Sequence, residues 1–257
     1  MNKNTHIGIF ETHVHFTSKE FSPHFERLVS LESNFQYLNV ATSLSESKEV
    51  VEQSREFAQI YCAIGIHPLY ITEEKHSLEE VITQLEELIL KNKSKVLAIG
   101  EIGLDFYRVT KEESYEEQIK WLETQLELAR KHNLSSVLHI RNAMSEAIEA
   151  LKKQSSFYGI IHSFDGTKEE LRELLSLSKD CFISFSPLIF RNIEKFRELI
   201  SETPLDRLLV ESDSPYLALS STICRSILRV ISEVKKIELS ELKKIVMENS
   251  KKALRIP

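Results

Sequence analysis

Cysteine, long apolar runs and Pro/Gly-rich linkers are all scarce in this sequence of 257 residues. The three cysteines, Cys62, Cys181 and Cys224, are an odd number without C-x-x-C spacing, so we expect buried, reduced thiols in a cytoplasmic protein. No apolar run reaches the length of about 18 residues that a membrane span needs. A charged leader followed by an apolar stretch is also missing, so we expect neither a membrane anchor nor a signal peptide.

Charge and composition narrow the class of protein further. The formal net charge of -6 argues against a protein that coats nucleic acid non-specifically, although it leaves room for an enzyme with a local positive site. The hydrophobic fraction of 42% is enough for a large core. A single α/β barrel commonly takes about 250 residues, while two small domains would also fit the length.

Eight short apolar runs recur along the chain, each nearly continuous, as is typical of strands buried on both faces. They are Ile7–Phe10, Phe35–Ala41, Ile60–Ile66, Val96–Gly100, Ser136–Ile140, Tyr158–His162, Cys181–Phe185 and Arg207–Glu211.

Helical patterns lie between these runs. One spans Ser77–Lys91, and capping boxes at Ser77, Thr110 and Thr167 predict helix starts. The stretch Ser220–Leu254 predicts one or two closing helices. Strands that alternate with helices predict one (β/α)8 barrel of the TIM type over residues 1–257, with its active site at the C-terminal ends of the strands. A doubly wound open sheet is the alternative, but no G-x-G-x-x-G supports it.

Titratable residues gather where the predicted strands end. His13 and His15 lie two residues apart after the first run, and because side chains on a strand alternate, they point the same way. A single His-x-His is more often structural than functional. Others lie at the C-terminal ends of the later runs or just after them: His67, Glu101, His139, Arg141, His162 and Asp213. Such groups are costly at the mouth of a barrel unless they are used or paired.

Imidazoles that converge with two carboxylates are ligands of divalent metal ions. The set is too large for one ion, so we expect two, with Glu101 best placed to bridge them. Two ions clamp the attacking and leaving oxygens of a displacement at phosphorus. Asp213 could take a proton from the attacking water.

The motifs around these residues resemble those of the TatD family of metal-dependent deoxyribonucleases, within the amidohydrolase-like barrels. Glu11–Phe16 is similar to the family's D-T-H-x-H-L. The other matching segments are Gly65–Pro68, Gly100–Tyr107, Gln118–Arg141, His162–Gly166 and Glu211–Tyr216.

The resemblance implies a role for each matching residue. One ion would be held by His13, His15, Glu101 and Asp213, and the second by Glu101, His139 and His162. His67 would lie near the scissile phosphate of a DNA substrate, with Asp105, Tyr107 and Arg141 supporting the metal ligands or binding the substrate. The family implies two magnesium ions and often exonuclease activity, although imidazole ligands suit Zn²⁺ or Mn²⁺ better. Nothing in the sequence indicates a protein partner.

Four departures from the family pattern concern the substrate more than the metals. Glu11 replaces an aspartate, Asn142 replaces a common aspartate, and Asp165 replaces a small hydroxyl residue. The segment 217–222 lacks the family's basic loop. The stretch Arg225–Arg255, with nine Lys/Arg against four Asp/Glu, could compensate or could simply be a solvated helical face.

Three functions therefore remain open. A DNA phosphodiesterase is favoured, because many other hydrolases on this barrel bridge their metals with a carbamylated lysine where this chain has Glu101. An amidohydrolase or lactonase is the second. A non-enzymatic subunit of a larger assembly is the third, and the complete ligand set argues against it.

Overall fold

The structure, a computed structural model, describes residues 8–154 and 156–256. Eight parallel strands form one sheet in sequence order. Their bounds are β1 Ile9–Val14, β2 Phe35–Val40, β3 Ile60–Ile64, β4 Val96–Asp105, β5 Ser135–Arg141, β6 Gly159–Ile161, β7 Cys181–Phe185 and β8 Leu208–Val210. The N–H of His15 donates to the C=O of Ser214 (2.9 Å) and the N–H of Asp213 to the C=O of His13 (3.1 Å), which closes the sheet. The barrel prediction is confirmed and the open sheet is wrong.

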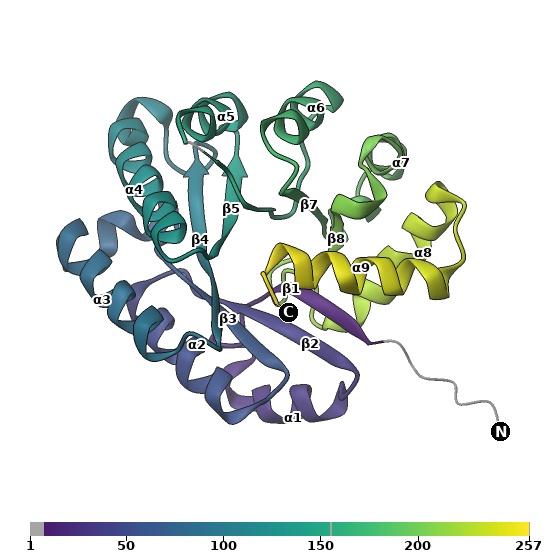
Figure 1. The fold of residues 1–257 in the computed structure, drawn as a ribbon, viewed down its shortest axis with the longest axis horizontal. Helices are drawn as coiled ribbons and strands as arrows, with labels where there is room; N and C mark the ends of the chain where they lie inside the picture. Colours follow the sequence, from purple (N-terminus) through teal and green to yellow (C-terminus); the bar gives the residue numbers. More distant parts are fainter. Residues whose placement is uncertain (1–7, 155, 257) are drawn as a thin grey trace.

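The helices surround the strands, as Figure 1 shows. Their bounds are α1 Phe25–Leu31, α2 Leu44–Glu56, α3 Leu78–Lys91, α4 Lys111–Lys131, α5 Met144–Lys153, α6 Lys168–Leu177, α7 Ile193–Glu202, α8 Cys224–Lys235 and α9 Leu239–Ala253. The closing stretch thus forms two helices. No helix in the described part of the chain has the length and apolarity to cross a membrane.

All three helices begin directly after the predicted residues, and two of the three predicted capping boxes are present. Ser77 and Thr167 each accept a hydrogen bond from the backbone N–H three residues on, with a glutamate returning the bond, so both are capping boxes. The prediction of a third box at Thr110 is wrong. Its hydroxyl donates instead to the carboxylate of Glu113 (2.7 Å), and it caps no backbone N–H.

Apolar side chains fill the barrel interior and close its N-terminal end. Every strand contributes to this inner cluster, which the end of α9 completes through Ala253 and Leu254. A second, larger cluster packs between the strands and the surrounding helices. Because the floor of the barrel is packed, the polar chemistry is confined to the C-terminal ends of the strands.

Two strands, β1 and β4, end four or more residues beyond the predicted ends, while the other bounds agree to within two residues. The predicted first run includes Ile7, which lies outside the described residues, and β1 continues to Val14, so that His13 lies within the strand. The fourth strand was expected to end at Gly100, yet β4 runs to Asp105. Its register against β5 is irregular between Ile99 and Ile102, after which pairing resumes. This irregularity lets the strand continue past Glu101, which therefore lies within it.

Candidate metal centre

Glu101 lies at the centre of a group of side chains at the mouth of the barrel. Its Oε2 atom lies 3.4 Å from Nε2 of His13 and 3.7 Å from Nε2 of His15. Its Oε1 atom lies 2.9 Å from Nδ1 of His139 and 3.2 Å from Nε2 of His162. Oδ1 of Asp213 lies 3.5 Å from Nε2 of His15. The structure therefore brings together all six residues that were predicted as metal ligands, with one oxygen of Glu101 facing each pair of imidazoles.

Hydrogen bonds at the outer ring nitrogens orient two of these histidines. Nδ1 of His15 lies 2.9 Å from the C=O of Val40, and a carbonyl oxygen only accepts, so Nδ1 carries the proton. Nδ1 of His162 lies 3.0 Å from Oε1 of Glu211, and this carboxylate likewise accepts the Nδ1 proton and orients the ring. In the neutral imidazoles, both Nε2 lone pairs are then directed at the centre.

His139 is oriented through its other nitrogen. Its Nε2 lies 3.1 Å from Oδ2 of Asp105, which leaves the Nδ1 lone pair facing Glu101. Nε2 of His13 lies only 3.0 Å from Nε2 of His15, and its buried Nδ1 has no partner among the described residues. Because Nδ1 of His15 carries its proton, Nε2–H of His13 can donate to the Nε2 lone pair of His15, and a cation shared by the two imidazoles would replace that proton.

Three overlapping groups of donor atoms are close enough to hold an ion. They are His13, His15 and Asp213; His13, Glu101 and His162; and His67, Glu101 and His139. The first two groups have free lone pairs or carboxylate oxygens throughout, so these residues fit divalent metal ions.

His67 differs from the other histidines of the centre. The backbone N–H of Leu69 donates to its Nδ1 (3.1 Å), so the neutral ring carries its proton on Nε2. That Nε2 lies 3.7 Å from Oε1 of Glu101. Burial and the neighbouring His139 lower the pKa of His67 to about 3, which keeps the ring neutral. His67 therefore offers a hydrogen-bond donor to the cavity, a role that agrees better with a place beside the substrate than with metal ligation.

Both carboxylates of the centre are held ionised. Burial by itself would raise the pKa of Glu101, but His162, His67 and His13 outweigh it and the pKa lies well below its ordinary value. Burial also opposes the ionisation of Asp213, and the contact with His15 lowers its pKa below the usual value. Burial opposes protonation of His162, but Glu211 and Glu101 outweigh it and raise the pKa of His162 well above its ordinary value. A divalent cation would take the place of that proton between the imidazole and the anionic oxygens.

A cavity of about 700 Å³ opens directly above these ligands. Arg141 lines it, and its guanidinium lies 4.1 Å from the ring centre of Tyr107. Asp105, by contrast, is engaged within the protein, because its Oδ1 accepts the N–H groups of Tyr107 and Arg108 (both 2.9 Å) while Oδ2 contacts His139. Asp105 thus positions His139 and the following loop, whereas Arg141 and Tyr107 face outward.

Two further arginines line the cavity that the sequence analysis did not single out, Arg108 and Arg191. Arg108 directly follows the matching motif Gly100–Tyr107, so its position next to that motif could have indicated a residue of the site. Arg191 lies after β7, one of two strands, with β2, for which no site residue was predicted. The four-residue helical turn Pro187–Phe190 carries it to the cavity, and the strand pattern did not indicate that turn.

Glu11, the longer residue in the place of the family's aspartate, joins the two ends of the sheet. Its Oε1 accepts the N–H of Ser212 (2.8 Å) and of His13 (3.3 Å), while Cys224 donates through Sγ to Oε2 (3.1 Å). Burial raises the pKa of Glu11 to about 8, and the bond from Cys224 acts in the opposite direction. This carboxylate therefore fixes the backbone beside His13 and beside Asp213.

The hydrogen bond between Cys224 and Glu11 should stabilise the protein, and Cys181 provides the control for testing this. Cys224 and Cys181 are both fully buried, but only Cys224 contacts a carboxylate. Cys224→Ala leaves Oε2 of Glu11 without that partner, so it should lower the free energy of unfolding by about 1–3 kcal/mol more than Cys181→Ala does. Urea titration of the metal-free variants measures the difference. Equal losses would show that the contact contributes nothing.

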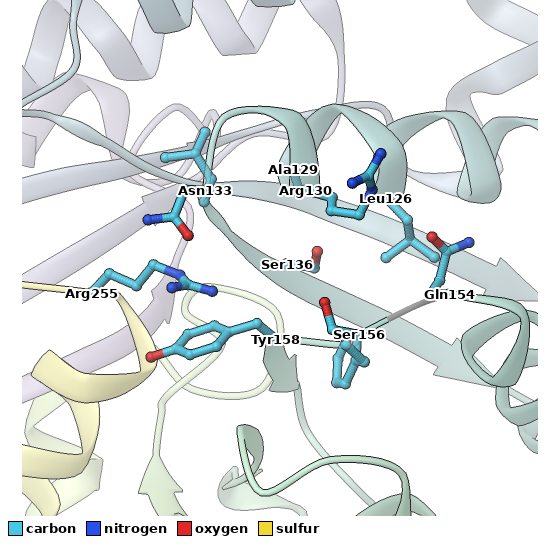
Figure 2. A pocket seen from close by; sticks show the side chains of 11 residues that line it. Leu126, Ala129, Arg130, Asn133, Ser136, Gln154, Ser156, Tyr158 and Arg255 are labelled. Carbon is cyan, nitrogen blue, oxygen red and sulfur yellow. The ribbon is translucent and has the colours of Figure 1, made fainter.

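A second, smaller cavity of about 150 Å³ lies at the opposite end of the barrel. Figure 2 shows Ser136, near the start of β5, together with Tyr158 and Arg255 among its lining residues. Arg255 lies over the ring of Tyr158, 3.6 Å from its centre. Among the described residues, none from 225–255 lines the cavity of the metal centre. The basic closing segment therefore does not replace the missing loop there.

Fold and donor set together define a metal-dependent hydrolase: a parallel (β/α)8 barrel whose strand ends carry a His/Glu/Asp centre beneath an open cavity. The family model described as "TatD related DNase" matches residues 10–255, and the chain belongs to this family.

Individual relatives agree with this assignment. The chain is 31% identical over 265 residues to the metal-dependent hydrolase MG009 of Mycoplasma genitalium, covering 95% of this chain and 97% of that protein. It is 28% identical over 262 residues to the metal-dependent hydrolase YabD of Bacillus subtilis, covering 96% and 99%. The crystal structure of the TatD homologue YjjV from Escherichia coli superimposes with a TM-score of 0.87 at 24% identity, covering 97% and 98%, and confirms the fold.

Proposed function

We propose that this barrel hydrolyses phosphodiester bonds of DNA from a free strand end, with two divalent metal ions. One observation carries the proposal: each oxygen of Glu101 faces a different pair of imidazoles, the arrangement expected of a carboxylate that bridges two ions. The family description supports DNA as the substrate. When bound, two ions supply Lewis acidity to the attacking and leaving oxygens of a displacement at phosphorus.

The residues of the chain divide the remaining work. Asp213, ionised and open to the cavity, accepts the proton that the attacking water loses. His67 holds its proton on Nε2 and donates a hydrogen bond to a phosphate oxygen without adding charge. Arg108, Arg141 and Arg191 face the phosphate from the rim.

The shape of the cavity supports attack at a strand end. The cavity ends blindly, because the interior of the barrel beneath it is packed with apolar side chains. A blind cavity admits the end of a strand more readily than the middle of a duplex. The resemblance implies magnesium, whereas four imidazoles favour manganese or zinc, so the assay must include all three metals.

The test uses metal-free protein and end-labelled DNA, single- and double-stranded, with Mg²⁺, Mn²⁺ or Zn²⁺ added in turn. Progressive shortening from one end, dependent on metal, is the expected result. Hydrolysis of esters or amides with no cleavage of DNA under any metal would instead favour an amidohydrolase on the same barrel. Metal binding without any hydrolysis would favour a non-enzymatic subunit.

A further inference from the structure

Positive charge at the mouth of the barrel is concentrated in three arginines, each from a different strand end. Arg108 follows β4, Arg141 ends β5 and Arg191 follows β7, and all three line the cavity above the metal centre. Arginine–carboxylate pairs within 4 Å in the described part of the chain are formed by other residues, namely Arg130, Arg172 and Arg197. The three guanidinium groups of the cavity are therefore available to phosphates.

Beside this cavity, next to Tyr70, the charged side chains at the surface are no longer mainly positive. A neighbouring hollow of about 440 Å³ shares Thr42 and Tyr70 with the cavity of the metal centre. Glu46, Glu73 and Glu74 line it, against two lysines and a histidine. A polyanionic strand that left the cavity past Tyr70 would meet three carboxylates and two lysines, so this hollow offers its phosphates no net attraction.

Two further segments at this end of the barrel carry no net positive charge. Residues 214–224, the loop after β8, contain no charged residue at all, and this is where the family's basic loop is missing. Asp165, exposed in the loop after β6, adds a negative charge. Lys195, which donates to the backbone oxygen of Asp165, balances that charge. The segments after β6 and β8 therefore give phosphates beyond the cavity no net attraction.

Exposed aromatic rings lie at the same end of the barrel and can hold unpaired bases, and two of them, Tyr70 and Tyr216, line the cavity. All of the exposed large aromatic side chains in the described chain lie in loops that follow strands: Tyr70, Tyr107, Phe190 and Tyr216. Tyr216 is 62% exposed and contacts the ring of His15, with 5.0 Å between the ring centres. Stacking of a base on such rings contributes about 1–3 kcal/mol per base and requires no charge.

We propose that the substrates of this site are short oligonucleotides, whose phosphates number no more than the arginines that can contact them. The cavity of about 700 Å³ has the size of a small-molecule site, enough for roughly two nucleotides. Binding then comes from the arginine triad and the aromatic rim, and chain beyond the third phosphate adds no affinity. This inference rests on the proposed phosphodiesterase function.

The experiment measures kcat/KM per strand end for a series of oligothymidylates, from the dinucleotide to about twenty nucleotides, with the metal that the DNA assay selects. We expect kcat/KM to rise until three phosphates are present and then to stay within about threefold. Its logarithm should fall with the logarithm of salt concentration with a slope of about -2, since about 0.7 counterions are released per single-strand phosphate.

A matched pair of variants checks that the arginines set this limit. Arg191→Gln should lower kcat/KM about tenfold for the short and the long substrates alike, whereas Arg172→Gln, which breaks an ion pair with Glu202 on the outer helices, should leave both unchanged. A rise in kcat/KM of more than about tenfold between the tetranucleotide, the first of the series with three phosphodiester groups, and the longest strand would overturn the inference and leave the phosphodiesterase function intact. Absence of hydrolysis at every length would overturn both.

Discussion

Glu101→Gln should lower the rate of hydrolysis by at least about 10³-fold and reduce the bound metal from two ions to at most one. The carboxylate faces two pairs of imidazoles at once, so its loss removes the bridge and half of the negative charge at the centre. A factor of 10³ corresponds to about 4 kcal/mol, the scale expected when metal-based stabilisation of the transition state is lost. Steady-state kinetics and metal analysis after dialysis measure the two quantities.

The matched control is Glu211→Gln. Glu211 is also a buried glutamate, but it contacts the centre only through His162. It orients His162 through Nδ1 and faces no second imidazole, so the variant should keep two ions and weaken metal binding by about 10–100-fold. Saturating metal should restore much of its activity but none of the activity of Glu101→Gln. If both variants responded equally to added metal, Glu101 would not be a bridge.

Gly103→Ala should destabilise the protein by at least about 3 kcal/mol and weaken metal binding at the same time. Gly103 has a φ of 149°, and a Cβ there would lie 1.8 Å from the carbonyl oxygen of His139. The residues are direct partners in the pairing of β4 with β5, so the strand that carries His139 must move away. Backbone strain and steric overlap of this kind each cost on the order of 1–3 kcal/mol.

Gly166→Ala supplies the comparison for Gly103. The Cβ at Gly166 would lie 2.7 Å from the carboxylate of Glu170 and from the buried ring of Phe164, so these side chains must shift, but none of its three nearest atoms belongs to the backbone. Urea titration of the metal-free variants and metal binding by calorimetry separate the two cases. A Gly103→Ala protein as stable as the parent, with unchanged metal affinity, would contradict the assigned geometry of β4. If it does not accumulate as soluble protein while Gly166→Ala does, the predicted strain is supported.

Much of the architecture could be predicted because its signals are local. Each strand reads as a short apolar run, since the barrel buries both faces of its sheet. The histidines and carboxylates lie at or near the C-terminal ends of these strands, as His13 and His162 illustrate, so their convergence follows from the parallel arrangement alone. The distances around Glu101 agree with that expectation.

The rest depends on contacts between segments far apart in the sequence. Cys224 reads as a simple buried thiol, and only the packing of α8 against the sheet places it on Glu11. The tautomer of His67 depends on the turn that presents the N–H of Leu69. Arg191 reaches the cavity because a short helical turn follows β7. No pattern of hydrophobicity reports such relations, and these are the features that distinguish this site from a generic barrel mouth.

Anomalous scattering from crystals grown with Mn²⁺ tests the central claim most directly, because it locates the ions without reference to any substrate. The account predicts two peaks within about 4 Å of each other, one beside His13, His15 and Asp213 and the other beside His139 and His162, with Glu101 touching both. A single peak, or two peaks of which only one contacts Glu101, would contradict it.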